Sequence, residues 1–316
     1  MFKYLVILLD KAAPSFCHYT VTEEESQLMP LDILRKAIRF GMVENLNIQL
    51  VMPKQDLPEE HLNVISEISA SKIASYSEQR NADVFVLDNP FELPESPIRN
   101  KSYVVRADKD SFAKTYQSIV DFSVKVNKVN VVFTDVESFD SNALMQYEAI
   151  LEHASGLVKG KFIFGHTPQI NILTDRMLLD EMNNCNAGWE SITVAPDGKF
   201  YVCPAFYYDK DGFDIGNVDT GVNIKNPQLY KLDHAPLCRE CDAFQCKRCI
   251  WLNRKLTKEV GIPSKQQCVM SHIERNASRL LLLGVREHGE FLPDRDIPEI
   301  DYLDPFENKL KKDKEL

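Results

Sequence analysis

The sequence lacks a long apolar run. The apolar stretch near its start has six residues, Tyr4 to Leu9, before Asp10 and Lys11 interrupt it. A secretory signal and a membrane-spanning helix both need a longer run than this. We therefore expect a cytoplasmic protein that does not enter membranes.

Positive charge is also scarce. The chain has 37 Lys and Arg residues against 47 Asp and Glu residues, which gives a formal net charge of -10. A surface of this sign repels phosphate backbones and anionic lipid heads. Nucleic acid and membranes are therefore not expected partners.

Common catalytic signatures are absent as well. The sequence contains no G-x4-G-K phosphate loop, no G-x-G-x-x-G, no H-E-x-x-H and no G-x-S-x-G. These absences argue against the nucleotide-binding, zinc-peptidase and serine-hydrolase classes that carry such motifs. Five histidines have no metal-like spacing, and we expect them to be ordinary polar or core residues: His153, His166, His234, His272 and His288.

Cysteine, in contrast, forms a dense pattern, since seven of the eight cysteines lie within 84 residues. In a reducing cytosol this clustering is better explained by metal ligands or reactive thiols than by disulfides. The spacing is C-x12-G-x4-C, then C-x2-C-x4-C-x2-C, then one cysteine more. The cysteines of this pattern are Cys185, Cys203, Cys238, Cys241, Cys246, Cys249 and Cys268. Seven thiols exceed one tetrahedral site, so we expect two centres, one of them with an open position, and either iron-sulfur clusters or zinc.

The rest of the chain alternates between segments with strand and helix patterns. The expected strands cover residues 4–9, 46–52, 84–87, 103–105, 129–133 and 170–173, and the expected helices cover 31–42, 111–124 and 143–157. Repeated units of this kind predict an α/β fold with a mostly parallel sheet, and we expect a partial barrel over residues 1–180. A cysteine-rich domain should follow over 181–285, with a hairpin at Asp197-Gly198 and a closing helix over 269–283. Residues 286–316 form a C-terminal extension with a charged tail.

The cysteine pattern resembles the SPASM domain, an auxiliary-cluster module of radical S-adenosylmethionine enzymes that modify peptides and proteins. The hairpin spacing fits that family's C-x9-15-G-x4-C motif, whereas the central run is one residue shorter in each of two gaps. The resemblance implies two [4Fe-4S] clusters, with zinc as the alternative. It assigns Cys185, Cys203 and Cys249 to the first centre, and it assigns Cys238, Cys241, Cys246 and Cys268 to the second.

The N-terminal part resembles a radical S-adenosylmethionine barrel that has lost its own cluster. Of the C-x3-C-x2-C motif only Cys17 is present, and Ala13 and Thr20 occupy the outer positions. The next strand ends VMPKQ where a Gly-Gly-Glu type motif would hold the cofactor. Binding and cleavage of S-adenosylmethionine are therefore not expected. Cys17 and His18 are either a loop pair without function or part of a partner's site.

The chain combines a SPASM-like domain with a barrel that lacks its own cluster motif. In this combination it is most similar to the CXXX repeat peptide maturase family. The resemblance implies maturation of a ribosomally made, cysteine-containing peptide that binds at or near an auxiliary centre. The sequence identifies no catalytic residue. An alternative is a non-catalytic scaffold, stabilised by clusters or zinc, that binds a peptide and recruits a partner modifying enzyme.

Overall fold

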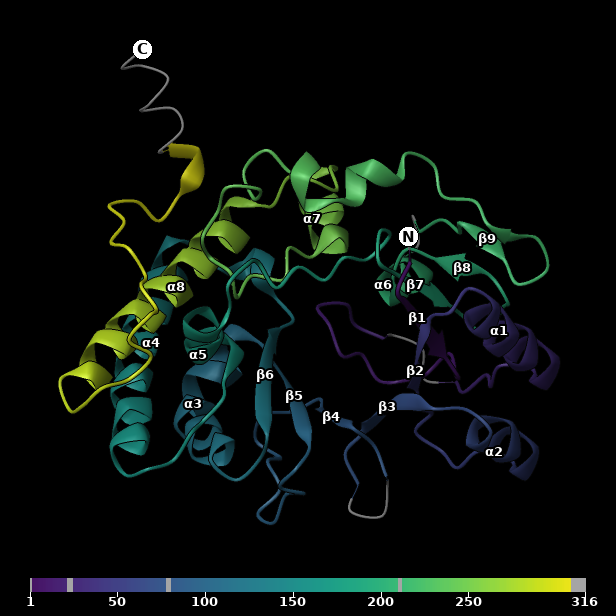
Figure 1. The fold of residues 1–316 in the computed structure, drawn as a ribbon, viewed down its shortest axis with the longest axis horizontal. Helices are drawn as coiled ribbons and strands as arrows, with labels where there is room; N and C mark the ends of the chain where they lie inside the picture. The colour runs from purple at the N-terminus through teal and green to yellow at the C-terminus, as the bar shows by residue number, and fades with distance from the viewer. Residues whose placement is uncertain (1, 22–24, 78–80, 210–211, 308–316) are drawn as a thin grey trace. The chain divides into compact units, whose positions relative to one another are not determined.

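A computed structural model describes residues 2–21, 25–77, 81–209 and 212–307 (Figure 1). The chain forms two compact units, each built from two separate stretches. The first unit comprises Met1–Val86 and Cys185–His234, and the second comprises Leu87–Asn184 and Ala235–Leu316. The division predicted from the sequence, into residues 1–180, 181–285 and 286–316, stays a prediction. The predicted charged tail lies outside the described residues.

The first unit contains a mainly parallel sheet in which the strands run in the order β4-β3-β2-β1-β7-β8, with β8 antiparallel to β7. Strand β1 lies centrally and its side chains from Leu5 to Leu8 are buried, which is typical of a parallel strand covered on both faces. The strands are β1 (Tyr4–Leu8), β2 (Asn47–Val51), β3 (Ala70–Ser75), β4 (Val84–Leu87), β7 (Ser191–Val194) and β8 (Phe200–Tyr201). The helices are α1 (Leu31–Val43), α2 (Glu59–Ser66) and α6 (Pro204–Tyr208), and a small ribbon pairs β9 (Gly216–Asn217) with β10 (Gly221–Val222).

Helix α1 confirms the helix that the sequence predicted over residues 31–42. Its buried residues Leu34, Ala37, Ile38 and Gly41 recur at steps of three and one, so that one stripe packs on the sheet. A Cβ atom at Gly41 would lie 3.1 Å from the side chains of Leu5 and Ile48. The glycine therefore lets α1 approach β1 and β2 closely.

The predicted hairpin is present between β7 and β8. Gly198 has a φ of +75°, a left-handed conformation that glycine adopts without a Cβ clash. The backbone N–H of Lys199 donates to Asp197 Oδ1 at 3.1 Å. The turn thus places Cys203 two residues after the end of β8, at the N-cap of α6.

The second unit combines a parallel strand pair with long helices. The strands are β5 (Ser102–Ala107) and β6 (Lys128–Phe133), and the helices are α3 (Lys109–Ser123), α4 (Ser141–Ile163), α5 (Asn171–Leu178), α7 (Ile250–Thr257) and α8 (Lys265–Arg286). Three 3-10 turns complete the described elements, at Val136–Ser138, Pro227–Tyr230 and Leu232–His234, the last two within the first unit. The predicted strands at 103–105 and 129–133 and the helices at 111–124, 143–157 and 269–283 are therefore confirmed.

The strand predicted over residues 170–173 is wrong, because this segment starts helix α5. Ile170 forms a single parallel bridge with Val129. The Asn171 side chain then takes the place of a strand backbone, since its Oδ1 accepts from Val131 N–H at 2.8 Å and its Nδ2 donates to Val131 O at 3.0 Å. One side chain satisfies the backbone N–H and C=O of Val131 at the edge of β6, and the chain turns into a helix.

Helix α8 lies alongside α4 and α5 in the second unit (Figure 1). Ser155 and Ser278 allow close packing, and their hydroxyls donate to Ala277 O at 3.3 Å and to Leu173 O at 2.8 Å. These contacts hold the helix that begins three residues before Cys268. Among the described residues, no helix is both long enough and apolar enough to cross a bilayer.

A buried carboxyl group links α8 to α4. Glu274 Oε1 accepts from the Tyr147 hydroxyl at 2.9 Å, and Gln245 Nε2 lies 3.3 Å from Oε2. Burial raises the pKa of Glu274 to about 7, and the two hydrogen bonds oppose that rise. The folded chain therefore binds a proton here at pH values where the unfolded chain, with a pKa near 4.5, has released it.

This carboxyl predicts a pH dependence of stability. Between about pH 4.5 and 7 the free energy of unfolding should fall as pH rises, by roughly 3 kcal/mol from this group. Glu274→Gln, which is neutral at every pH, should remove that slope and be more stable than the parent at pH 8. Urea denaturation at pH 5, 6, 7 and 8 measures the difference. The exposed Glu148→Gln on α4 is the matched control, and equal slopes in Glu274→Gln and the parent would contradict the assignment.

Candidate metal centre

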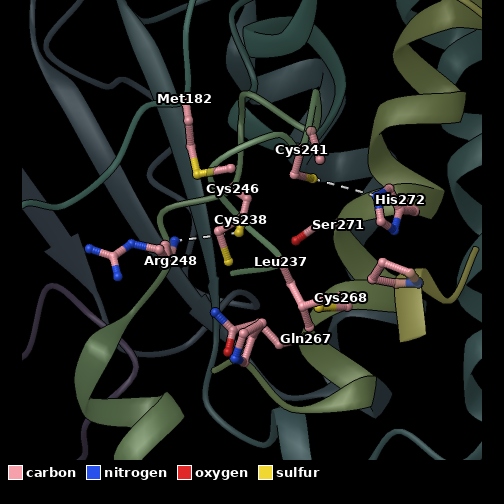
Figure 2. A pocket seen from close by; sticks show the side chains of 13 residues that line it. Met182, Leu237, Cys238, Cys241, Cys246, Arg248, Gln267, Cys268, Ser271 and His272 are labelled. Atoms are coloured by element: carbon pink, nitrogen blue, oxygen red, sulfur yellow. Dashed lines mark hydrogen bonds between the residues drawn. The ribbon is translucent and has the colours of Figure 1, made fainter. Parts of the chain in front are cut away.

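Four cysteines of the second unit line one pocket (Figure 2), which we call the thiol pocket: Cys238, Cys241, Cys246 and Cys268. Its volume is about 370 Å³, counting the space at its open mouth. The remaining lining is mostly apolar, with four polar neighbours: Arg248, Gln267, Ser271 and His272. The structure therefore brings together the four residues that the sequence assigned to the second centre.

A loop over residues 235–249 and the first turn of α8 position these thiols. The loop folds through successive tight turns, in which Cys238, Cys241 and Cys246 donate their backbone N–H groups to carbonyls three residues earlier at 2.9–3.1 Å. Cys268 lies four residues after Ser264, whose hydroxyl caps α8. Three thiols thus come from a tightly turned loop and one from a rigid helix.

An ion-pair network fastens the loop to the helices. Asp242, next to Cys241, accepts from Arg275 Nε at 3.0 Å and from Arg275 Nη2 at 2.7 Å. Arg176 Nη2 lies 3.3 Å from the same carboxylate, and the Arg176 guanidinium stacks over Phe244. Arg275 is fully buried, so this fork on Asp242 is a strong anchor. Hydrogen bonds to Arg275 and Arg176 hold the pKa of Asp242 below its usual value against the opposing effect of burial.

Burial controls the protonation of the pocket cysteines. It raises the pKa of Cys238 to about 12 and that of Cys241 to about 11, and it raises the pKa values of Cys246 and Cys268 as well. Without a cation the thiols are therefore protonated at neutral pH. A metal centre binds thiolates, so its binding here would release protons.

His272 is a pocket residue that sequence reasoning treated as ordinary. Its Nε2 lies 3.6 Å from Cys241 Sγ, and its Nδ1 donates to Leu303 O at 2.7 Å. The neutral ring thus presents Nε2 to the thiol as an acceptor. One signal in the sequence indicated this position, since His272 follows Cys268 by four residues and shares its helix face.

The three cysteines assigned to the first centre are distributed over both units. Cys185 and Cys203 belong to the first unit, where Cys185 is exposed and Cys203 is half-buried. Cys249 belongs to the second unit and precedes α7, and it does not line the thiol pocket. A centre formed by these three stays a prediction.

The single barrel-loop cysteine, Cys17, is half-buried in the first unit. Its loop is ordered by Ser15, whose hydroxyl donates to Tyr19 O at 2.6 Å. Tyr19 in turn stacks on Tyr208 of α6, with the ring centroids 5.3 Å apart. Ala13, at one outer position of the expected cluster motif, is buried and has only a methyl side chain. The buried Ala13 and Tyr19 therefore occupy part of the loop interior, beside the buried Ser15.

Within the part of the chain that the structure describes, no group of three or more His, Cys, Asp or Glu side chains is placed to hold a single metal ion. The four thiols nevertheless share one pocket. A [4Fe-4S] cluster bonds each thiolate to a different iron, whereas one zinc ion draws four ligands to about 2.3 Å from a single point. Four thiolate donors are the set that a [4Fe-4S] cluster takes, so the donor set fits a cluster.

Residues 185–249 match a family model, SPASM, that is described as an iron-sulfur cluster-binding domain. The cysteine-rich part of this chain is SPASM-like. The match contains six of the seven clustered cysteines, and Cys268 follows it. No curated protein matches the chain.

Two solved structures of an anaerobic sulfatase maturase, anSMEcpe, resemble the chain over most of its length. One, a histidine-tagged form with bound AdoMet, is 12% identical with a TM-score of 0.52, and the match covers 92% of this chain and 97% of that one. The other, with bound AdoMet and the Kp18Cys peptide, is 14% identical with a TM-score of 0.50 and covers 90% and 99%. This likeness shows the fold alone, and it confirms the predicted α/β fold with a partial barrel.

Removing two ligands of the thiol pocket should remove one cluster. The cysteine pattern predicts two cubanes, which hold about eight irons. In the double variant Cys241→Ser and Cys268→Ser, reconstituted iron should therefore fall by about half, to about four per chain. Colorimetric iron and sulfide assays after anaerobic reconstitution measure the loss, and circular dichroism checks folding. Cys17→Ser is the matched control and should keep all its iron. Full retention in the double variant would contradict the assignment.

Proposed function

We propose that this chain takes part in the maturation of a ribosomally made, cysteine-containing peptide, as a SPASM maturase or its cluster-bearing subunit. The observation that carries the proposal is the thiol pocket, in which four cysteines of the SPASM-like part and of α8 converge. A peptide role is supported by the resemblance to a maturase whose solved structure holds the Kp18Cys peptide.

Two clusters with different ligand sets fit the seven thiols. We assign Cys238, Cys241, Cys246 and Cys268 to a fully ligated [4Fe-4S] centre in the thiol pocket. The remaining three thiols, Cys185, Cys203 and Cys249, form a second set that leaves one coordination position for a substrate cysteine. When bound, such clusters supply electron transfer and an iron that attracts thiolates.

The barrel is proposed to be inactive in radical chemistry. The two similar structures contain AdoMet, but here Ala13 and Thr20 occupy the outer positions of the cluster motif around Cys17. Three thiolates are needed to hold the cluster that binds the cofactor, and one cannot replace them. This observation also favours the second candidate function, a scaffold that binds a peptide and recruits a separate modifying enzyme.

A peptide with cysteine at every fourth residue should bind through a thiolate and change the electronic structure of the three-cysteine centre. We expect the electron paramagnetic resonance spectrum of the reduced, reconstituted chain to change when this peptide is added. The same peptide with serine in place of cysteine should leave the spectrum unchanged. Identical spectra with and without the cysteine peptide would contradict substrate binding at a cluster.

A second readout of the same samples separates a cluster-bearing subunit from a hidden radical enzyme. With S-adenosylmethionine and dithionite added, chromatography should detect no 5′-deoxyadenosine beyond a protein-free control. Production of 5′-deoxyadenosine by the chain alone would show that the barrel is active after all.

A further inference from the structure

Cys246 is the pocket cysteine on which hydrogen-bond donors converge. The backbone N–H of Arg248 donates to Cys246 Sγ at 3.4 Å, as the dashed line in Figure 2 shows. Ser271 lines the same pocket from α8. Burial raises the pKa of the Cys246 thiol, and hydrogen bonding from the Ser271 side chain opposes that rise. Figure 2 shows the Ser271 side chain pointing into the pocket toward the sulfur atoms. Cys246 thus accepts from one backbone N–H, and the Ser271 hydroxyl is a second donor directed into the same pocket.

The position of Ser271 is set by two contacts between the loop and the helix. Ser271 follows Cys268 by three residues, so both side chains lie on the pocket face of α8. Its carbonyl accepts from Gln245 Nε2 at 2.6 Å, and the same amide group reaches Glu274 Oε2 at 3.3 Å. Because Gln245 directly precedes Cys246, this bridge keeps the hydroxyl and the sulfur together.

His272 does not compete for this role. The Nδ1–H of His272 is used by Leu303 O, so the neutral ring has no N–H left to donate to Cys241. The Arg248 donor belongs to the backbone and is present whatever the side chain. Ser271 is the hydroxyl-bearing residue of the pocket lining, and its substitution changes a donor that points toward the sulfur atoms.

Hydrogen bonds to a cluster-bound sulfur stabilise the reduced cluster more than the oxidised one, because reduction adds negative charge to the sulfurs. We propose that Ser271 is a positioning residue whose hydroxyl donates to the Cys246 thiolate and raises the reduction potential of the cluster in the thiol pocket. The proposal rests on the cluster that the proposed function places there. Ser271 would set how readily this centre accepts an electron.

The test is a redox titration of the reconstituted chain, followed by electron paramagnetic resonance. Ser271→Ala should shift the midpoint potential of the thiol-pocket cluster to a more negative value, because one hydrogen bond is lost. Ser271→Thr retains a hydroxyl and should restore the parent potential. Ser278→Ala, the same change at a buried position of α8 outside the pocket lining, should leave it unchanged.

A second readout separates hydrogen bonding from a general structural effect. Electron-nuclear double resonance should detect an exchangeable proton near the reduced cluster that is absent from Ser271→Ala. The signal lost in Cys241→Ser with Cys268→Ser identifies which cluster is observed. If Ser271→Ala keeps both the parent potential and this proton signal, the inference about Ser271 is wrong, but the proposed cluster in the thiol pocket is not contradicted. If the parent binds no cluster, the proposed function itself has failed.

Discussion

The constraint on which the second unit depends is the cost of ionising four thiols, one buried and three half-buried, that share one pocket. Ionising them together without a cation would bury several like charges in a medium of low dielectric constant. Burial alone already raises the pKa of each thiol. A positively charged metal core removes this conflict, because it binds each thiolate directly. A ligand that is both cationic and thiophilic therefore stabilises the thiolates of this pocket most.

The surrounding structure can be understood as support for this pocket. A loop of tight turns has little core of its own, so its position comes from Asp242, which Arg275 and Arg176 anchor to α8 and α5. Helix α8 is held by its packing against α4 and contributes Cys268. The loop over residues 235–249 and α8 are far from α4 and α5 in the sequence, but all of them belong to the second unit. Metal binding and the stability of this unit should accordingly be coupled.

Much of the fold could be predicted from periodicity, because strands such as β1 are continuous apolar runs and α1 carries one apolar stripe. Strand β3 was missed because its sequence, ASKIAS, has few large apolar residues. The segment at 170–173 was assigned wrongly because its apolar residues suit a strand, whereas Asn171 satisfies the edge of β6 and lets a helix begin. Side-chain contacts of this kind leave no trace in local periodicity.

The pocket was predictable in part. Cysteine spacing and the SPASM resemblance grouped Cys238, Cys241, Cys246 and Cys268, and the structure places these four around one cavity. The cysteine pattern by itself did not single out His272 or Ser271, because which helix residues face the loop depends on tertiary packing.

The most direct test of a cluster-binding chain is metal and sulfide analysis, with Mössbauer spectroscopy, of protein purified without oxygen. The account predicts a brown protein that absorbs at about 400 nm and contains about eight irons with matching sulfide. A colourless protein with stoichiometric zinc and no sulfide would contradict it.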